Sequence, residues 1–260
     1  MKRREALAGI AAATLAGMES PAATAPNVYL EVKTWRLHNS REDQSTRVAD
    51  FIQNGLWPSL SRIGRKLVGA FANVIGENGP YYVTLTQYPS LMSFQECLEK
   101  LRDDQTYQDA VQKLSAGPGL PFVRVESSLL RSFDVMPQPA VPEPGEGGAH
   151  RIFELRTYES QSPTALTRKV GMFNSGEAQA FKRVGMRPVF FAETIVGPRQ
   201  PNLMYMLSYD DLAARDKLWR EFGSDPEWTK LRSRPELSDA EIVANISNVI
   251  LRPLAFSPIR

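Results

Sequence analysis

Three polar residues at alternate positions of one predicted strand are the clearest candidates for chemistry. Glu154, Arg156 and Tyr158 alternate with the apolar Phe153 and Leu155, so a strand places the three polar side chains on one face. A carboxylate and a guanidinium can orient a polar ligand, and a tyrosine can donate a proton. If the apolar face meets helices, the polar face points into the interior of the fold. A purely structural Arg–Glu pair is the alternative interpretation.

Arg156 is predicted to be held by a carboxylate. A guanidinium that lies between apolar surfaces loses its hydration and needs planar acceptors nearby. Glu154 lies two residues away on the same face, and Glu193 could come from another strand.

Two further carboxylates, Glu177 and Glu193, are candidate acid and base groups. Glu177 lies on the apolar stripe of a predicted helix, between Phe173 and Phe181, where an unpaired carboxylate is costly. It therefore needs a partner or a role, and an ion pair with a neighbouring arginine or a backbone hydrogen bond is the structural alternative. Glu193 alternates with apolar residues and is predicted to face the same interior.

Composition limits the class of partner. The 31 basic and 29 acidic residues are interspersed, and the formal net charge of +2 gives no reason to expect nucleic acid or an anionic membrane as a partner. His38 and His150 have no partner at a metal-ligand spacing, and Cys97 is the one cysteine and is predicted to be a core residue. The sequence therefore predicts no cofactor and favours small molecules or proteins as partners.

Residues 1–25 resemble an export signal. Lys2-Arg3-Arg4 precedes a short run of small apolar residues and a small-residue zone that ends at Ala25. The arginine pair matches part of the twin-arginine pattern, although Ala6 stands where an aromatic residue is usual. The apolar run is too short to span a membrane. We expect a periplasmic or secreted protein, with a cytoplasmic protein that carries an N-terminal tail as the alternative.

A repeated order of elements indicates a duplicated domain. A strand at 203–209, a helix at 212–222 and a polar corner at 225–228 recur as 81–88, 91–101 and 104–107. The segment 152–158 likewise matches 29–35 position for position, so Glu31, Lys33 and Trp35 are counterparts of Glu154, Arg156 and Tyr158.

Each copy has the element order β-α-β-β-α-β of a ferredoxin-like unit. The copies span 27–135 and 151–256, and 136–150 is a predicted linker that is rich in proline and glycine. Pro58 predicts a kink in the first helix of the first copy, or a helix in two pieces. Because each sheet would otherwise expose aromatic residues, we expect the two sheets to face each other. The predicted fold is α+β, with two tandem ferredoxin-like units that form an intrachain pseudo-dimeric α–β barrel.

The second copy resembles the NIPSNAP domain at several separated points. The matching segments are 154–158, 176–177, 188–194, 202–228 and 246–254, whereas the first copy is weaker and lacks the Gly-Glu pair of Gly176-Glu177. The resemblance implies the dimeric α–β barrel superfamily, which includes monooxygenases, haem-handling enzymes and binding proteins.

Three functions follow as hypotheses. The favoured one is an exported barrel that binds a small apolar or amphipathic molecule in its lumen. The alternatives are a cofactor-independent monooxygenase or isomerase that uses the lumen, and a protein-protein interaction module; self-association into homo-oligomers is also expected. The predicted ligand-binding residues are Glu154, Arg156, Tyr158, Glu193, Glu31, Lys33 and Trp35. The candidate catalytic residues are Glu154, Arg156, Tyr158, Glu177 and Glu193.

Overall fold

Eight strands form a closed antiparallel barrel in the computed structural model, which describes residues 25–39, 41–141 and 151–260. The strands are β1 (Tyr29–Arg36), β2 (Lys66–Ile75), β3 (Tyr81–Tyr88), β4 (Arg124–Ser132), β5 (Ile152–Glu159), β6 (Arg187–Val196), β7 (Asn202–Tyr209) and β8 (Asn245–Pro253). Around the barrel their order is β1-β3-β2-β8-β5-β7-β6-β4. The predicted fold class is therefore confirmed.

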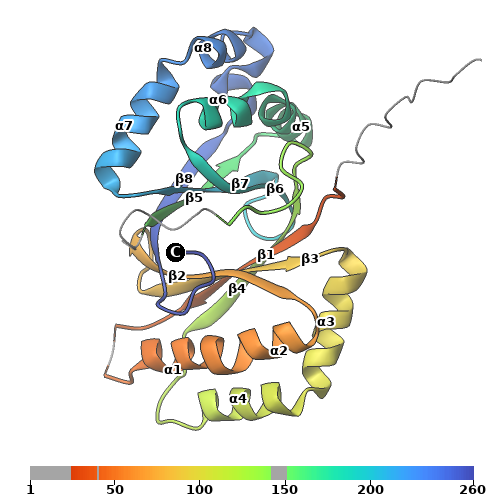
Figure 1. Cartoon of the computed structure of the whole chain (residues 1–260), viewed down its shortest axis with the longest axis vertical. Coiled ribbons are helices and arrows are strands. Elements are labelled where there is room, and N and C mark those ends of the chain that lie inside the picture. Colours follow the sequence, from red (N-terminus) through yellow and green to blue (C-terminus); the bar gives the residue numbers. More distant parts are fainter. Residues whose placement is uncertain (1–24, 40, 142–150) are drawn as a thin grey trace, which may run out of the picture.

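Helices cover the outside of both sheets. They are α1 (Gln44–Phe51), α2 (Trp57–Arg62), α3 (Leu91–Asp103), α4 (Gln105–Ser115), α5 (Pro163–Met172), α6 (Ala178–Arg183), α7 (Leu212–Gly223), α8 (Pro226–Arg232) and α9 (Asp239–Ile242). Figure 1 shows α1–α4 on one side of the molecule and α5–α8 on the other, with the two sheets between them. The first unit contains β1–β4, and the second contains β5–β8.

The two units join along both edges of their sheets. β2 of the first unit pairs with β8 of the second, and β4 pairs with β6. Because both seams are hydrogen-bonded, neither sheet has a free edge, and closure of this kind removes the edge strands on which proteins aggregate.

The first helix of each unit contains a π-helical turn. These turns are Ile52–Leu56 and Phe173–Glu177, and each includes a glycine, Gly55 or Gly176. A Cβ on Gly55 would lie 2.5 Å from Ala110 Cβ, and one on Gly176 would lie 3.0 Å from Leu231 Cδ2. The glycines thus let the next helices, α4 and α8, approach closely.

The helix around Pro58 is in two parts, α1 and α2, on either side of the π-helical turn, which is the second of the two predicted forms. The irregular turn ends at Leu56, before Pro58, which lies in the first turn of α2. A missing backbone N–H costs little in that turn, so the proline is tolerated there.

Each sheet is buried on both faces. One apolar cluster lies inside the barrel and includes Leu30, Val32, Phe153 and Leu155. Two further clusters lie between the sheets and their helices, one in each unit. Cys97 is buried in the outer cluster of the first unit, which confirms its prediction as a core residue.

The C-terminal tail closes one end of the barrel. Ile259 is buried in the interior cluster, and the Ser257 hydroxyl accepts a hydrogen bond of 3.0 Å from the backbone N–H of Ala70 in β2. Phe71 and Phe153 pack beside it, with ring centroids 4.9 Å apart. Figure 1 shows the C-terminus between the two sheets.

Part of the predicted linker lies against the strands. The backbone N–H of Val28 donates to Pro137 O (3.3 Å), and that of Ala140 donates to Val189 O (2.8 Å). Residues 142–150, like residues 1–24 of the predicted export signal, lie outside the described residues. No helix in the described part of the chain is long and apolar enough to cross a membrane.

Candidate functional site

The face of β5 that carries Glu154, Arg156 and Tyr158 lies against the helices and not in the lumen. Phe153 and Leu155 belong to the cluster inside the barrel, whereas Tyr158 packs in the cluster under the helices. The prediction that this polar face lines the lumen is therefore wrong. Both sides of the sheet are apolar overall, and the polar side chains lie on the side where helix α7 supplies hydrogen-bonding partners.

Glu154 is the centre of a buried polar network on that side. Its side chain has no exposed surface, and each carboxylate oxygen accepts several hydrogen bonds. The donors to Oε1 are Arg156 Nη1, Arg215 Nη2 and Asn248 Nδ2, each at 2.7 Å, and those to Oε2 are Arg215 Nε at 3.0 Å, Trp219 Nε1 at 3.1 Å and Tyr209 Oη at 3.4 Å. The ion pair between Glu154 and Arg156 confirms the predicted carboxylate partner of this arginine.

These donors keep Glu154 ionised. Burial by itself would raise the pKa of the Glu154 carboxyl, but the hydrogen bond from Arg215, the charge of Arg156 and the hydrogen bond from Asn248 lower the pKa to about 2. A carboxylate with so low a pKa and so many donors is a poor proton acceptor near neutral pH. The geometry favours an anchoring role for Glu154 over a role as acid or base.

Arg156 links Glu154 to two tyrosines. Its Nη2 donates to Tyr158 Oη (3.2 Å), and Tyr205 Oη donates to the same oxygen (3.0 Å). The guanidinium carbon lies 4.5 Å from the ring centroid of Trp219, within the range of a cation–π contact. Burial raises the pKa of Tyr205, so this hydroxyl stays protonated and can donate.

Glu177 pairs with a lysine. Lys169 Nζ lies 2.9 Å from Glu177 Oε2, and the two side chains are only 1% and 2% exposed. The ammonium also lies 5.2–5.6 Å from the ring centroids of Tyr158, Phe173 and Trp228. Burial raises the pKa of Glu177, although the charge of Lys169 opposes this shift. The predicted need for a partner is confirmed, but the partner is Lys169, neither an arginine nor the backbone.

The counterpart residues of the first unit also face helices. Trp35 packs edge-on against Phe51 and Phe122 in the outer cluster, and Lys33 Nζ lies 3.1 Å from Glu31 Oε1. Their predicted place in the lumen is wrong for the same reason as that of Glu154.

Glu193 lies apart from these residues. It shares a strand face with Phe191, which packs under the helices, whereas Ala192 between them belongs to the interior cluster. Within the described residues it forms neither a hydrogen bond nor an ion pair with Arg156 or Glu177. The expectation that Glu193 faces the lumen is thus wrong, and the structure does not join it to Glu177.

The lumen contains a different site, at the barrel end opposite the C-terminal tail. A cavity of about 750 Å³ opens there. Its floor is apolar and consists of inward side chains of the strands: Val32, Val83, Leu155, Met204 and Val249. This volume lies within the range of roughly 300–1,000 Å³ that is typical of small-molecule sites.

The rim of this cavity is polar and rich in arginine. Arg36 Nε and Arg124 Nε lie 3.0 Å and 2.6 Å from the two oxygens of Glu126. Burial would raise the pKa of Glu126, but the two arginines lower it, so this carboxylate is ionised. Arg36 also stacks over Tyr81, with its guanidinium carbon 4.5 Å from the ring centroid.

Arg199 completes the rim from the turn between β6 and β7. Its backbone φ of 60° lies in the left-handed region, which non-glycine residues seldom adopt and which is enriched at functional sites. One of its guanidinium nitrogens donates to Ser247 Oγ (3.2 Å). The cavity lining holds three arginines and two carboxylates, Glu77 and Glu126, so its positive charges exceed its negative ones.

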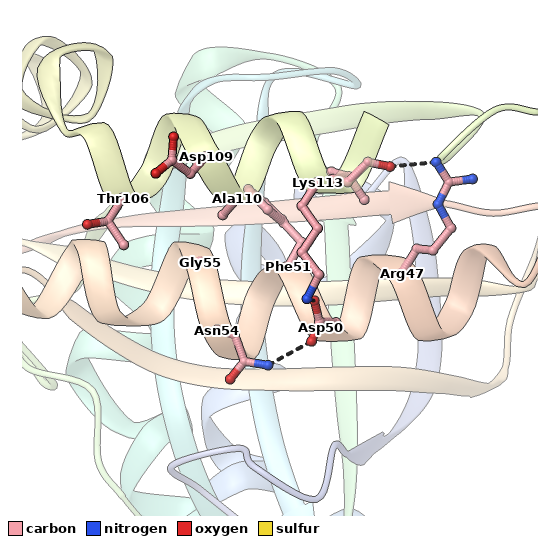
Figure 2. Close-up of a pocket in the computed structure, with 10 residues that line it drawn as sticks. Arg47, Asp50, Phe51, Asn54, Gly55, Thr106, Asp109, Ala110 and Lys113 are labelled. Atoms are coloured by element: carbon pink, nitrogen blue, oxygen red, sulfur yellow. Dashed lines mark hydrogen bonds and ion pairs between the residues drawn. The ribbon is translucent and has the colours of Figure 1, made fainter. Parts of the chain in front are cut away.

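A second hollow is a surface groove of about 270 Å³ between α1 and α4. Several of its polar groups are paired with one another or with the chain. Lys113 lies 2.8 Å from Asp50 Oδ2. Asn54 donates to Asp50 and Arg47 donates to Leu114 O, as Figure 2 shows. With these groups occupied, the groove is a weaker candidate than the cavity in the barrel.

Residues 153–258 match the family model NIPSNAP. By this match the second unit is similar to a NIPSNAP domain. The match covers the network around Glu154 and Glu177 but not the first unit, which supplies Arg36, Arg124 and Glu126 of the barrel-end cavity. No curated protein matches the chain.

Solved structures with the same fold extend over both units. An inferred monooxygenase from Lactobacillus acidophilus NCFM is 9% identical, with a TM-score of 0.57 over 87% of this chain and 94% of that one. An inferred monooxygenase from Fusobacterium nucleatum is 11% identical, with a TM-score of 0.53 over 88% and 93%. An anthrone oxidase-like protein is 10% identical, with a TM-score of 0.50 over 88% and 92%. At these identities the likeness shows the fold alone, and it extends over both units.

Several site residues escaped prediction from the sequence. Arg215 and Trp219 occupy one face of a helix, four residues apart, beside apolar residues, and that arginine on an apolar stripe was a usable signal. The rim arginines of the barrel had no such signal, since each comes from a different strand or turn.

Proposed function

We propose that the cavity at the open end of the barrel binds a small amphipathic molecule that has an apolar body and an anionic head group. The observation that carries this proposal is the cavity itself, in which an apolar floor inside the barrel continues to an arginine-rich rim. An apolar ligand body would displace water from the floor, and this transfer favours binding by roughly 25 cal/mol per Å² of apolar surface that is buried.

The arginines of the rim can bind the anionic head group of the ligand. Arg199 uses one nitrogen on a serine hydroxyl and offers further N–H donors, and guanidinium groups bind carboxylate, sulfonate or phosphate through paired hydrogen bonds. Arg36 already bonds to Glu126 and stacks on the Tyr81 ring, so its side chain forms part of the cavity wall. The head group is therefore expected to contact Arg199 first.

A binding titration with anilinonaphthalene sulfonate, an aromatic probe with one anionic group, tests the proposal. The native protein should bind the probe with enhanced fluorescence, and decanoate should displace it. Arg199→Ala should weaken binding roughly tenfold, about 1.4 kcal/mol, through the loss of one charge-assisted contact. Met204→Trp, which fills the floor, should abolish it.

The matched control is Arg220→Ala, which removes the same charge from the exposed outer side of α7. This variant should bind the probe like the native chain. Melting curves of each variant separate cavity binding from the probe's affinity for partly unfolded chains. Equal affinity in the native chain, Arg199→Ala and Met204→Trp would contradict the proposal.

The enzymatic and interaction-module hypotheses stay predictions. The residues that the enzymatic hypothesis assigned to the lumen lie on the other face of the sheet, so we propose no reaction for them. Self-association likewise stays a prediction.

A further inference from the structure

The two units place different side chains at equivalent positions between sheet and helices. In the first unit Lys33 of β1 is opposite Thr84 of β3, and in the second Arg156 of β5 is opposite Tyr205 of β7. The large tyrosine of the second unit is thus a small threonine in the first.

An equivalent position in the helices also has a smaller side chain in the first unit. Leu98 lies eight residues after Ser90, which caps α3, and Trp219 lies eight residues after Asp211, which caps α7. Leucine therefore occupies the place of the tryptophan that contacts Glu154 in the second unit. The space that Tyr205 and Trp219 fill in the second unit is available in the first.

A cavity of about 230 Å³ occupies this space. Its lining includes Glu31, Lys33, Leu56, Thr84, Leu98 and Tyr107. It is smaller than the roughly 300 Å³ at which drug-sized sites begin, so its occupant must be a compact molecule. It lies on the opposite face of the sheet from the barrel cavity, since Lys33 and Thr84 alternate with the inward residues of their strands.

Lys33 is the polar group that can bind a ligand there. Its ammonium has three donors, and among the described residues it contacts one carboxylate, that of Glu31. Glu31 does not depend on this contact alone, because it also accepts hydrogen bonds from Tyr88 Oη (3.0 Å) and Ser127 Oγ (2.7 Å). Lys33 can therefore donate to a ligand while the buried carboxylate stays hydrogen-bonded.

We infer that this cavity binds a small organic monocarboxylate with a compact apolar body. The carboxylate accepts from Lys33, and the apolar body packs among Leu56, Leu98 and Tyr107. Arg102, an exposed residue of the lining, adds a second positive charge at the entrance. The inference is independent of the ligand proposed for the barrel.

Benzoate, with benzyl alcohol as its neutral counterpart, is a suitable pair of probes. Backbone amide shifts of the full chain, followed by NMR during titration, should move in β1, β3 and α3. Benzoate should bind roughly tenfold or more tightly than benzyl alcohol, because only the carboxylate forms an ion pair with the Lys33 ammonium. Lys33→Met should remove that preference.

Leu98→Trp tests the location, since it installs the side chain that the second unit has at this position. It should abolish benzoate binding and leave the melting temperature equal to or above that of the native chain. Leu91→Trp is the matched control, because Leu91 is an exposed leucine of the same helix outside the lining, and this variant should bind normally. Arg199→Ala should also bind normally. Absence of benzoate-induced shifts in the native chain, or equal binding by Leu98→Trp, would overturn the inference.

Discussion

The two units of the barrel share the order β-α-β-β-α-β but differ in what lies between sheet and helices. In the second unit, Glu154 is surrounded by arginine, asparagine, tryptophan and tyrosine donors, and the space is filled. In the first, Glu31 accepts from one lysine and two hydroxyls beside a cavity. The difference teaches that a few side chains decide whether this layer is a packed ionic core or a binding site.

The π-helical turns of the two units also differ in their side chains. Glu177 ends the turn of the second unit, and Leu56 ends that of the first. Eight residues earlier, Lys169 in the second unit corresponds to Val48 in the first. The first unit thus shows that an apolar pair satisfies this position of the fold.

The largest expected effect is that of breaking the buried ion pair. Glu177→Leu leaves Lys169 buried without its carboxylate and should cost roughly 3–5 kcal/mol of unfolding free energy. The double variant Lys169→Val with Glu177→Leu copies the first unit and should recover most of that loss, because well-packed apolar residues often replace a buried pair without net cost. Urea unfolding measures both.

Glu221→Leu, on the exposed side of α7, serves as the control and should stay within about 0.5 kcal/mol of the native chain. If the double variant proved as unstable as the single one, the ionic pair would be required by the second unit in a way that the first unit does not reveal.

Acidification should weaken the second unit through Glu154. The pKa of this carboxyl is about 2 in the folded chain against an ordinary 4.5, which corresponds to about 3 kcal/mol. Because the folded pKa is the lower one, the stabilisation is complete above pH 4.5 and is lost as the pH falls towards 2. Urea midpoints from neutral to acidic pH should fall more steeply for the native chain than for Glu154→Gln.

Glu31→Gln gives the matching measurement in the first unit. A Glu154→Gln profile that runs parallel to the native one over the whole pH range would contradict the assignment of this acid sensitivity to Glu154.

The smallest expected difference concerns the two cations beside the central glutamates. Arg156→Met should cost roughly 1–3 kcal/mol, since Glu154 keeps Arg215, Asn248 and Trp219 while the charged hydrogen bonds and aromatic contacts of Arg156 are lost. Lys33→Met should cost less, about 0.2–1 kcal/mol, because its side chain is 23% exposed. Thermal melts compare the two, and equal losses would argue against any difference in environment.

Much of the fold could be predicted because the sequence contains two copies of the same order of strands and helices. The match of 29–35 to 152–158 identified the duplication, and period-two alternation assigned Glu154 and Arg156 to one face and Phe153 and Leu155 to the other. The need for burial on both faces then required the sheets to meet.

The side on which each face lies could not be predicted. Both faces of β5 contact apolar clusters, so alternation divides the residues into two sets without orienting them. The orientation depends on Arg215 and Trp219, which lie 61 and 65 residues from Glu154 in the chain. The barrel-end cavity could not be predicted for a related reason. Arg36, Arg124 and Arg199 come together only when the barrel closes.

The export signal in residues 1–25 stays a prediction. Export through a twin-arginine signal rests on Arg3-Arg4, and these residues lie outside the described part of the chain.

The C-terminal strand and tail also set the order in which the molecule can be completed during synthesis. β8 follows the other seven strands of the barrel in the sequence, and it joins β5 of its own unit to β2 of the first. Ala70 and Ser257, which bond across this junction, are 187 residues apart, so the β2 edge of the first sheet is paired only after the strands of the second unit have been synthesised. A nascent chain that stops short of β8 therefore keeps the edge of β2 unpaired and leaves the end of the barrel without Ile259, and it carries the aggregation risk that the finished barrel avoids.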